Sequence, residues 1–165
     1  MRYLVLGTVD GLITAGTISA ALLFRGERLD PSLALSLAVV VATINALTVF
    51  VSEFSHQMRE VRELTYKLTL RNAASRWTLL HTRAVYASMR SSLLNFAASL
   101  LGASSILTTA VFSPIATVLA TAAVILSAGF IMARESWVEF IEFVAMVSLA
   151  VVTGLAVGLA FPILA

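Results

Sequence analysis

Long apolar runs separated by short polar breaks set the pattern of this chain. Five runs are long enough to cross a hydrocarbon core of about 30 Å, for which an α-helix needs roughly 20 residues. These runs are 3–24, 33–54, 91–112, 115–133 and 138–164. The pattern predicts an all-α, polytopic membrane protein with five transmembrane helices.

Two of these helices have clear start signals. Asp30-Pro31 precedes the second run and Ser113-Pro114 precedes the fourth. An Asp or Ser cap followed by proline at the first helical position is typical of a helix N-terminus. Both pairs therefore predict where a helix begins, and Pro162 weakens the end of the last one.

The one extended polar stretch, 56–90, contains neither Gly nor Pro. We expect the second helix to continue beyond the membrane, to reverse near 71–75, and to return as a helix into the third span. The predicted organisation is a single membrane domain: residues 1–55 form helices one and two, 56–90 a helical insert, and 91–165 helices three to five.

Basic residues predict the orientation in the membrane. The stretch 56–90 holds seven Lys and Arg residues against Glu60 and Glu63. By the positive-inside rule it is cytoplasmic. The N-terminus is then inside and the C-terminus outside, in the plasma membrane of a prokaryote or a vacuole-type organelle of a eukaryote. Topology and anionic lipid explain the basic charge, so no nucleic-acid partner is expected.

Composition supports the membrane assignment and narrows the chemistry. The 165 residues are 59% apolar and 12% charged, against about 45–50% and 25% in soluble domains. Cysteine is absent, which excludes disulfides and thiolate metal sites. No phosphate-binding loop, metalloprotease motif or nucleophile elbow occurs, so we expect no enzyme and no permanently bound cofactor.

Asp10 lies inside the first apolar run. A carboxylate facing lipid near a helix centre costs roughly 2.5–3.5 kcal/mol, so intramembrane acids usually mark an ion or substrate path. A structural hydrogen bond to Thr14 or to a neighbouring helix is the alternative. With a rise of 1.5 Å per residue, Asp10 lies about 10 Å from Tyr3, and Asn45 about 12 Å from Glu53. If the first two helices pack side by side, Asp10 and Asn45 lie at one level.

The second helix carries a polar stripe about 100° wide. Oxygen and imidazole donors of this kind suit Fe²⁺, Mn²⁺ and similar ions. For Glu60 and Glu63 a solvated helix face is the alternative, since Arg59 and Lys67 lie four residues either side of Glu63. The stripe consists of Asn45, Ser52, Glu53, His56, Glu60 and Glu63.

A third acidic cluster opens the last helix. Glu135, Glu139 and Glu142 share one face. They could complete a metal-collecting vestibule with Glu53 and Glu60. They could equally anchor the helix at the membrane surface beside Trp137.

Small residues recur every fourth position in the first helix. Gly7, Gly11, Ala15 and Ser19 form this row, and the last helix has a similar one. Such rows allow close helix approach and often mark dimer seams. The first row therefore predicts a homodimer seam beside Asp10, and packing within one protomer is the alternative.

The string Asp10-Gly11-Leu12-Ile13-Thr14 resembles the Asp-Gly-Leu-x-Thr motif in the first helix of the vacuolar iron transporter family. The stretch 45–54, which ends in Ser-Glu-Phe and is followed by Glu60, resembles that family's second helix, and Ser91–Ala103 its third less specifically. The resemblance implies a homodimeric, proton-coupled exporter of Fe²⁺ or a related ion from the cytoplasm. It also implies a path between protomers and glutamates in the insert that collect metal.

The function expected from these residues is export of a divalent transition metal by proton antiport. Asp10, Asn45 and Glu53 would line the path. Its partners would be the bilayer, a second copy, divalent cations and protons. Asn45 stands where the family has aspartate, and Val49 where it has methionine. A non-transporting membrane scaffold or assembly subunit with the same fold is therefore the alternative. The expected metal ligands are Asp10, Glu53, His56, Glu60, Glu63, Glu139 and Glu142.

Overall fold

Five α-helices make up the described part of the computed structural model, which covers residues 2–24, 29–69, 79–133 and 136–160. All five are long and apolar enough to span a membrane, as the sequence predicts. The structure is all-α, and no strand occurs in the described ranges. The helices are α1 (Arg2–Phe24), α2 (Pro31–Thr69), α3 (Leu79–Phe112), α4 (Pro114–Met132) and α5 (Trp137–Ala160).

Both predicted proline starts are confirmed. The backbone of Ser113 is extended, and its hydroxyl accepts the main-chain N–H of Ile115 at 3.2 Å, so α4 begins at Pro114 with a side-chain cap. Likewise α2 begins at Pro31, and the Asp30 carboxylate accepts the hydroxyl of Ser32 at 2.6 Å.

The helices α2 and α3 are much longer than a membrane crossing. Their 39 and 34 residues correspond to about 58 and 51 Å, against a hydrocarbon core of about 30 Å. Each therefore continues well beyond its apolar part. The reversal predicted near 71–75 lies outside the described residues, as does the predicted end of the last helix at 161–164.

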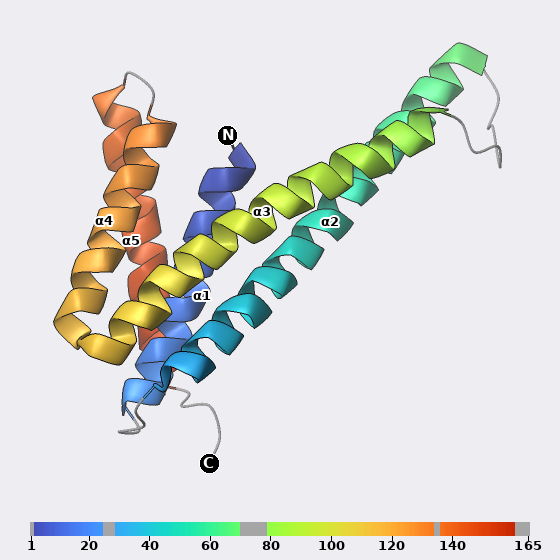
Figure 1. Cartoon of the computed structure of the whole chain (residues 1–165). Coiled ribbons are helices and arrows are strands. Elements are labelled where there is room, and N and C mark those ends of the chain that lie inside the picture. Colours follow the sequence, from blue (N-terminus) through green and yellow to red (C-terminus); the bar gives the residue numbers. More distant parts are fainter. Residues whose placement is uncertain (1, 25–28, 70–78, 134–135, 161–165) are drawn as a thin grey trace.

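Figure 1 shows α2 and α3 side by side as a long hairpin that slants away from α4 and α5, with α1 between the two pairs. The N-terminus of α1, the far ends of the hairpin and the adjoining ends of α4 and α5 lie toward one side of the molecule. The end of α1, the start of α2 and the α3–α4 turn lie toward the other (Figure 1). This is the alternation that five consecutive crossings produce.

Small side chains form the interfaces of the bundle. Ala34, Ala38, Ala42 and Ala46 recur every four residues along the buried face of α2, and the core continues across α3 through Ala103 and Ile106. By contrast, α4 and α5 expose large apolar side chains such as Leu119, Phe130 and Leu149. Small residues inside and large apolar residues outside are typical of helices packed in lipid.

Two residues of the small-residue row of α1, Gly7 and Gly11, pack against α3 of the same chain. A Cβ at Gly7 would lie 2.6 Å from the main-chain oxygen of Asn95, and one at Gly11 would collide with the main chain of Ser99. Ala15 and Ser19 are buried as well. Gly7 and Gly11 therefore serve packing within one protomer, one of the two roles that the sequence leaves open for the row.

The corresponding row of α5 packs against α1. A Cβ at Gly154 would lie 2.6 Å from the Thr17 hydroxyl, and one at Gly158 would lie 2.5 Å from the Thr17 main-chain oxygen. Close backbone approach on two sides fixes α1 at the centre of the bundle, which places Asp10 inside the assembly of helices.

Candidate functional site

Asp10 occupies the middle of α1 and is partly buried. The hydroxyl of Thr14 donates to the main-chain carbonyl of Asp10 at 2.8 Å, so this bond does not engage the carboxylate. Among the described residues, no hydrogen bond or ion pair reaches the Asp10 carboxylate. Burial without such a partner is costly, which makes this acid the strongest functional candidate in the chain.

Asn45 is connected to the level of Asp10 by contacts with α3. Its side-chain N–H donates to the hydroxyl of Ser99 at 2.9 Å, and the main chain of Ser99 lies directly against Gly11, the residue after Asp10. The expectation that Asp10 and Asn45 share a level agrees with this chain of contacts. The helix α3 lies between them, a position that the periodicity of the first two helices does not show.

Polar residues of α3 form a buried stripe that sequence reasoning missed. Ser88, Asn95 and Ser99 are fully buried, and Ser92 donates to the main-chain carbonyl of Ala46 at 2.7 Å. The four positions are spaced i, i+4, i+7 and i+11, which puts them on one helix face. That spacing was the available signal, and it links α3 to both α1 and α2.

Asn95 is the least satisfied member of this stripe. Neither atom of its carboxamide has a hydrogen-bond partner in the described part of the chain. The oxygen would lie 2.8 Å from a Cβ at Gly7, so only glycine leaves room for the amide at this crossing. An unpaired buried amide costs about 1–3 kcal/mol, and such groups call for a functional explanation.

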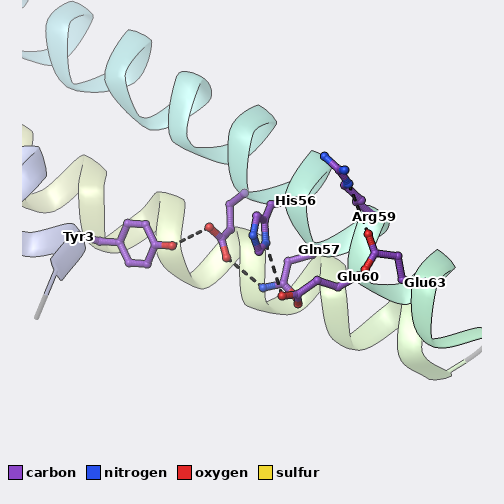
Figure 2. A network of polar contacts seen from close by, with 7 residues as sticks. Tyr3, His56, Gln57, Arg59, Glu60 and Glu63 are labelled. Atoms are coloured by element: carbon purple, nitrogen blue, oxygen red, sulfur yellow. Dashed lines mark hydrogen bonds and ion pairs between the residues drawn. The ribbon is translucent and has the colours of Figure 1, made fainter. Parts of the chain in front are cut away.

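Glu53 lies further along α2, toward the N-terminal end of α1. Its carboxylate accepts the Tyr3 hydroxyl at 2.6 Å and the Gln57 side-chain amide at 3.0 Å (Figure 2). Tyr3 and Asp10 are seven residues apart and therefore share a face of α1. The carboxylate thus marks one end of a face that has Asp10 two turns further in.

Beyond Glu53 the stripe of α2 is exposed and forms pairs along its own helix. His56 lies 3.9 Å from Glu60, and Arg59 lies 3.5 Å from Glu63 (Figure 2). Exposed pairs of this kind stabilise a helix only weakly. They leave the carboxylates accessible from water.

The acids of α5 lie apart from the α2 stripe. Glu139 and Glu142 are exposed in the first turns of α5, across α1 from the projecting part of α2 (Figure 1). Glu135 lies outside the described residues. No three carboxylate or imidazole side chains gather into a metal-binding group among the residues that the structure describes. One chain brings together Tyr3, Glu53 and Gln57, and separately Asn45 and Ser99, rather than the predicted seven ligands.

Comparison of the chain with protein-family models, curated proteins and solved structures returns no match.

Proposed function

We propose that this protein transports a divalent transition-metal ion, Fe²⁺ or Mn²⁺ in particular, across a membrane in exchange for protons. The observation that carries the proposal is Asp10, a carboxylate midway along a membrane-length helix without a hydrogen-bond or ion-pair partner among the described residues. The resemblance of residues 10–14 and 45–54 to the vacuolar iron transporter family supports the choice of ion.

In this proposal Asp10 alternates between a metal ion and a proton. A cation at the carboxylate offsets the cost of keeping the charge away from water, and a proton removes that charge when the ion leaves. The neutral oxygens near its level, those of Asn45, Ser99 and Asn95, supply further ligands for a hard or intermediate cation. Val49 supplies no sulfur, which favours harder ions.

The homodimer is part of the same proposal. Since no trio of acids or imidazoles assembles in the described part of one chain, a second copy has to complete the coordination of the ion. Because Gly7 and Gly11 are in contact with α3, the seam would use another surface of the protomer, with Asp10 facing it.

The projecting ends of α2 and α3 serve as the cytoplasmic insert. The seven basic residues of the stretch 56–90 favour the cytoplasmic side, and exposed Glu60, Glu63 and His56 lie where arriving ions would first meet the protein. Glu53 would pass ions from this insert toward Asp10, after exchanging its bonds to Tyr3 and Gln57 for the metal.

Flux measurements in proteoliposomes test the transport proposal. Mn²⁺ or Co²⁺ entry and the accompanying proton movement are followed with internal dyes for the native protein and for Asp10→Asn. We expect the substitution to abolish both signals, because a carboxamide carries no charge and releases no proton. Asp30→Asn is the matched control, since asparagine caps helices as well as aspartate does.

Two results would contradict the proposal. One is equal flux by the native protein and Asp10→Asn, and the other is absence of flux for every divalent ion tested. Helical circular dichroism and a monodisperse elution profile confirm that each variant is folded, so that lost flux reports the carboxylate and not the fold.

The orientation can be tested separately because the chain has no cysteine. Lys67→Cys and Asp30→Cys each introduce one exposed thiol, at opposite ends of α2. In intact cells an impermeant maleimide should label Asp30→Cys and leave Lys67→Cys unlabelled until the membrane is opened. The reverse labelling would overturn the cytoplasmic assignment of the insert.

A non-transporting scaffold or assembly subunit is the second candidate. The bonds from Tyr3 and Gln57 to Glu53, together with the paired acids further along α2, favour it, because these carboxylates already have partners within the protein. Calorimetry with Mn²⁺ and Co²⁺ separates the candidates: binding that is lost in Asp10→Asn supports the transporter, and no binding supports the scaffold.

A further inference from the structure

A hollow of about 750 Å³ lies between the second half of α1 and the helices α4 and α5. Leu12, Gly16 and Ser19 line it from α1, and mostly aliphatic side chains line it from the other two helices. Sites for small organic ligands have volumes of about 300–1,000 Å³ and are largely apolar with a few polar groups. In size and lining this groove fits that description.

Gly16 keeps the groove open. A Cβ at this position would meet no atom within 4 Å, whereas at Gly7, Gly11 and Gly154 it would collide with a neighbouring helix. The space beside Gly16 is thus a feature of the α4–α5 side of α1 and does not arise from loose packing of the whole helix.

Ser19 supplies an unused hydrogen-bond donor to the groove. Its side chain is 2% exposed, and its hydroxyl has no partner in the described part of the chain. On the same helix Thr14 and Thr17 donate to the carbonyl four residues earlier, at 2.8 and 2.9 Å, and Ser19 does not. A buried hydroxyl left unpaired costs about 1–3 kcal/mol, so a ligand that accepts a hydrogen bond here would be held in place.

The shape of the groove identifies the kind of ligand. Along α5 its lining extends from Val144 to Leu159, about 22 Å at 1.5 Å per residue. This length is about one and a half times the depth of one leaflet, which is half of a hydrocarbon core of about 30 Å. The volume spread over that length gives a cross-section of about 34 Å², less than half that of a helix about 10 Å wide. A single hydrocarbon chain fits this space.

We infer that the groove binds one acyl chain of a membrane lipid, with the lipid's ester carbonyl accepting a hydrogen bond from the Ser19 hydroxyl. Ser19 lies five residues, about 8 Å, from the end of α1 at Phe24, near the depth at which lipid ester groups meet the hydrocarbon. The exposed apolar faces of α4 and α5 put the mouth of the groove in contact with such chains. This inference is independent of the proposed transport.

Native mass spectrometry of the purified, delipidated protein tests the inference. A phospholipid with ester-linked chains is added back and compared with the ether-linked lipid of the same headgroup and chain length, which lacks the carbonyl. We expect one tightly held ester lipid per chain and about fivefold weaker binding of the ether lipid, as the loss of one hydrogen bond predicts. Ser19→Ala should bind both lipids equally, at the weaker level.

Gly16→Leu provides the steric test. The leucine side chain enters open space, so folding should be unaffected, and the retained lipid should be lost. Gly16→Ala, which adds one methyl group, is the matched control and should keep most of the binding. Equal lipid retention by the native protein and Gly16→Leu would overturn the inference. So would equal binding of ester and ether lipids, or a second protein chain in place of lipid that disappears in Gly16→Leu.

Discussion

Two sides of the same helix, α1, use glycine in opposite ways. On the side that faces α3, Gly7 and Gly11 bring the two backbones into contact, and buried polar groups such as Asn95 and Ser99 lie at the crossing. On the side that faces α4 and α5, Gly16 adjoins empty space and an apolar groove. The first side is tightly packed and polar, whereas the second is hollow and apolar beside Gly16 and closely packed at Thr17.

In the two proposals made above, this contrast separates ion transport from lipid binding within one bundle. Close packing on the α3 side fixes the level of Asp10 relative to Asn45, which an ion path requires. The hollow on the other side keeps the central helix accessible to the lipid phase. The change in stability caused by a glycine-to-alanine substitution should therefore have opposite signs on the two sides of α1.

The largest change in stability, a loss, is expected for Gly11→Ala. The added methyl group would collide with the main chain of Ser99, which cannot move without shifting α3. Overpacking of this kind costs typically about 1–3 kcal/mol, and contact with main chain places it toward the upper end. Reversible unfolding in mixed micelles, followed by circular dichroism as sodium dodecyl sulfate is titrated, measures the loss. A midpoint equal to that of the native protein would show that the crossing is looser than described.

The next largest effect on stability is expected for two buried or partly buried asparagines, Asn95 of α3 and Asn45 of α2. Asn95→Leu replaces an unpaired buried amide by an apolar group of similar branching, whereas Asn45→Leu leaves the buried Ser99 hydroxyl without its donor. Removing one partner of a buried hydrogen bond costs about 1–3 kcal/mol, and removing an unpaired polar group regains part of such a penalty.

We therefore expect Asn95→Leu to be more stable than Asn45→Leu by about 1 kcal/mol or more in the same unfolding titration. Equal losses would mean that Asn95 is hydrogen-bonded in the folded protein. In the transport assay Asn95→Leu should slow flux despite its stability, because a neutral ligand near Asp10 is removed.

Much of this fold could be predicted from the sequence, because the periodicity and length of apolar runs follow directly from bilayer thickness. The starts at Pro31 and Pro114 were equally predictable, since proline after a capping side chain acts locally. The partner of the small-residue row was not. Periodicity shows which residues share a helix face but not which helix meets that face, so Gly7 and Gly11 suited a dimer seam as well as contact with α3.

The same limit applies to the candidate site. Asp10 was recognised because a charge in an apolar run is costly wherever its helix packs. Asn95 could not be recognised from the sequence. Its amide is unusual because it is buried without a hydrogen-bond partner among the described residues, and this depends on neighbours that lie on another helix. Glu53 was assigned to metal from its own helix, whereas Tyr3, fifty residues away, donates to its carboxylate.

The smallest change in stability, and the only expected gain, belongs to Gly16→Ala. The methyl group meets no atom within 4 Å, and alanine loses less backbone entropy than glycine on entering a helix, so stability should rise by up to about 1 kcal/mol. The unfolding titration used for Gly11→Ala measures both variants under one condition, which makes each the control of the other. If Gly16→Ala lost stability as Gly11→Ala does, the groove beside α1 would be closed in the membrane. The two sides of the helix would then be packed alike.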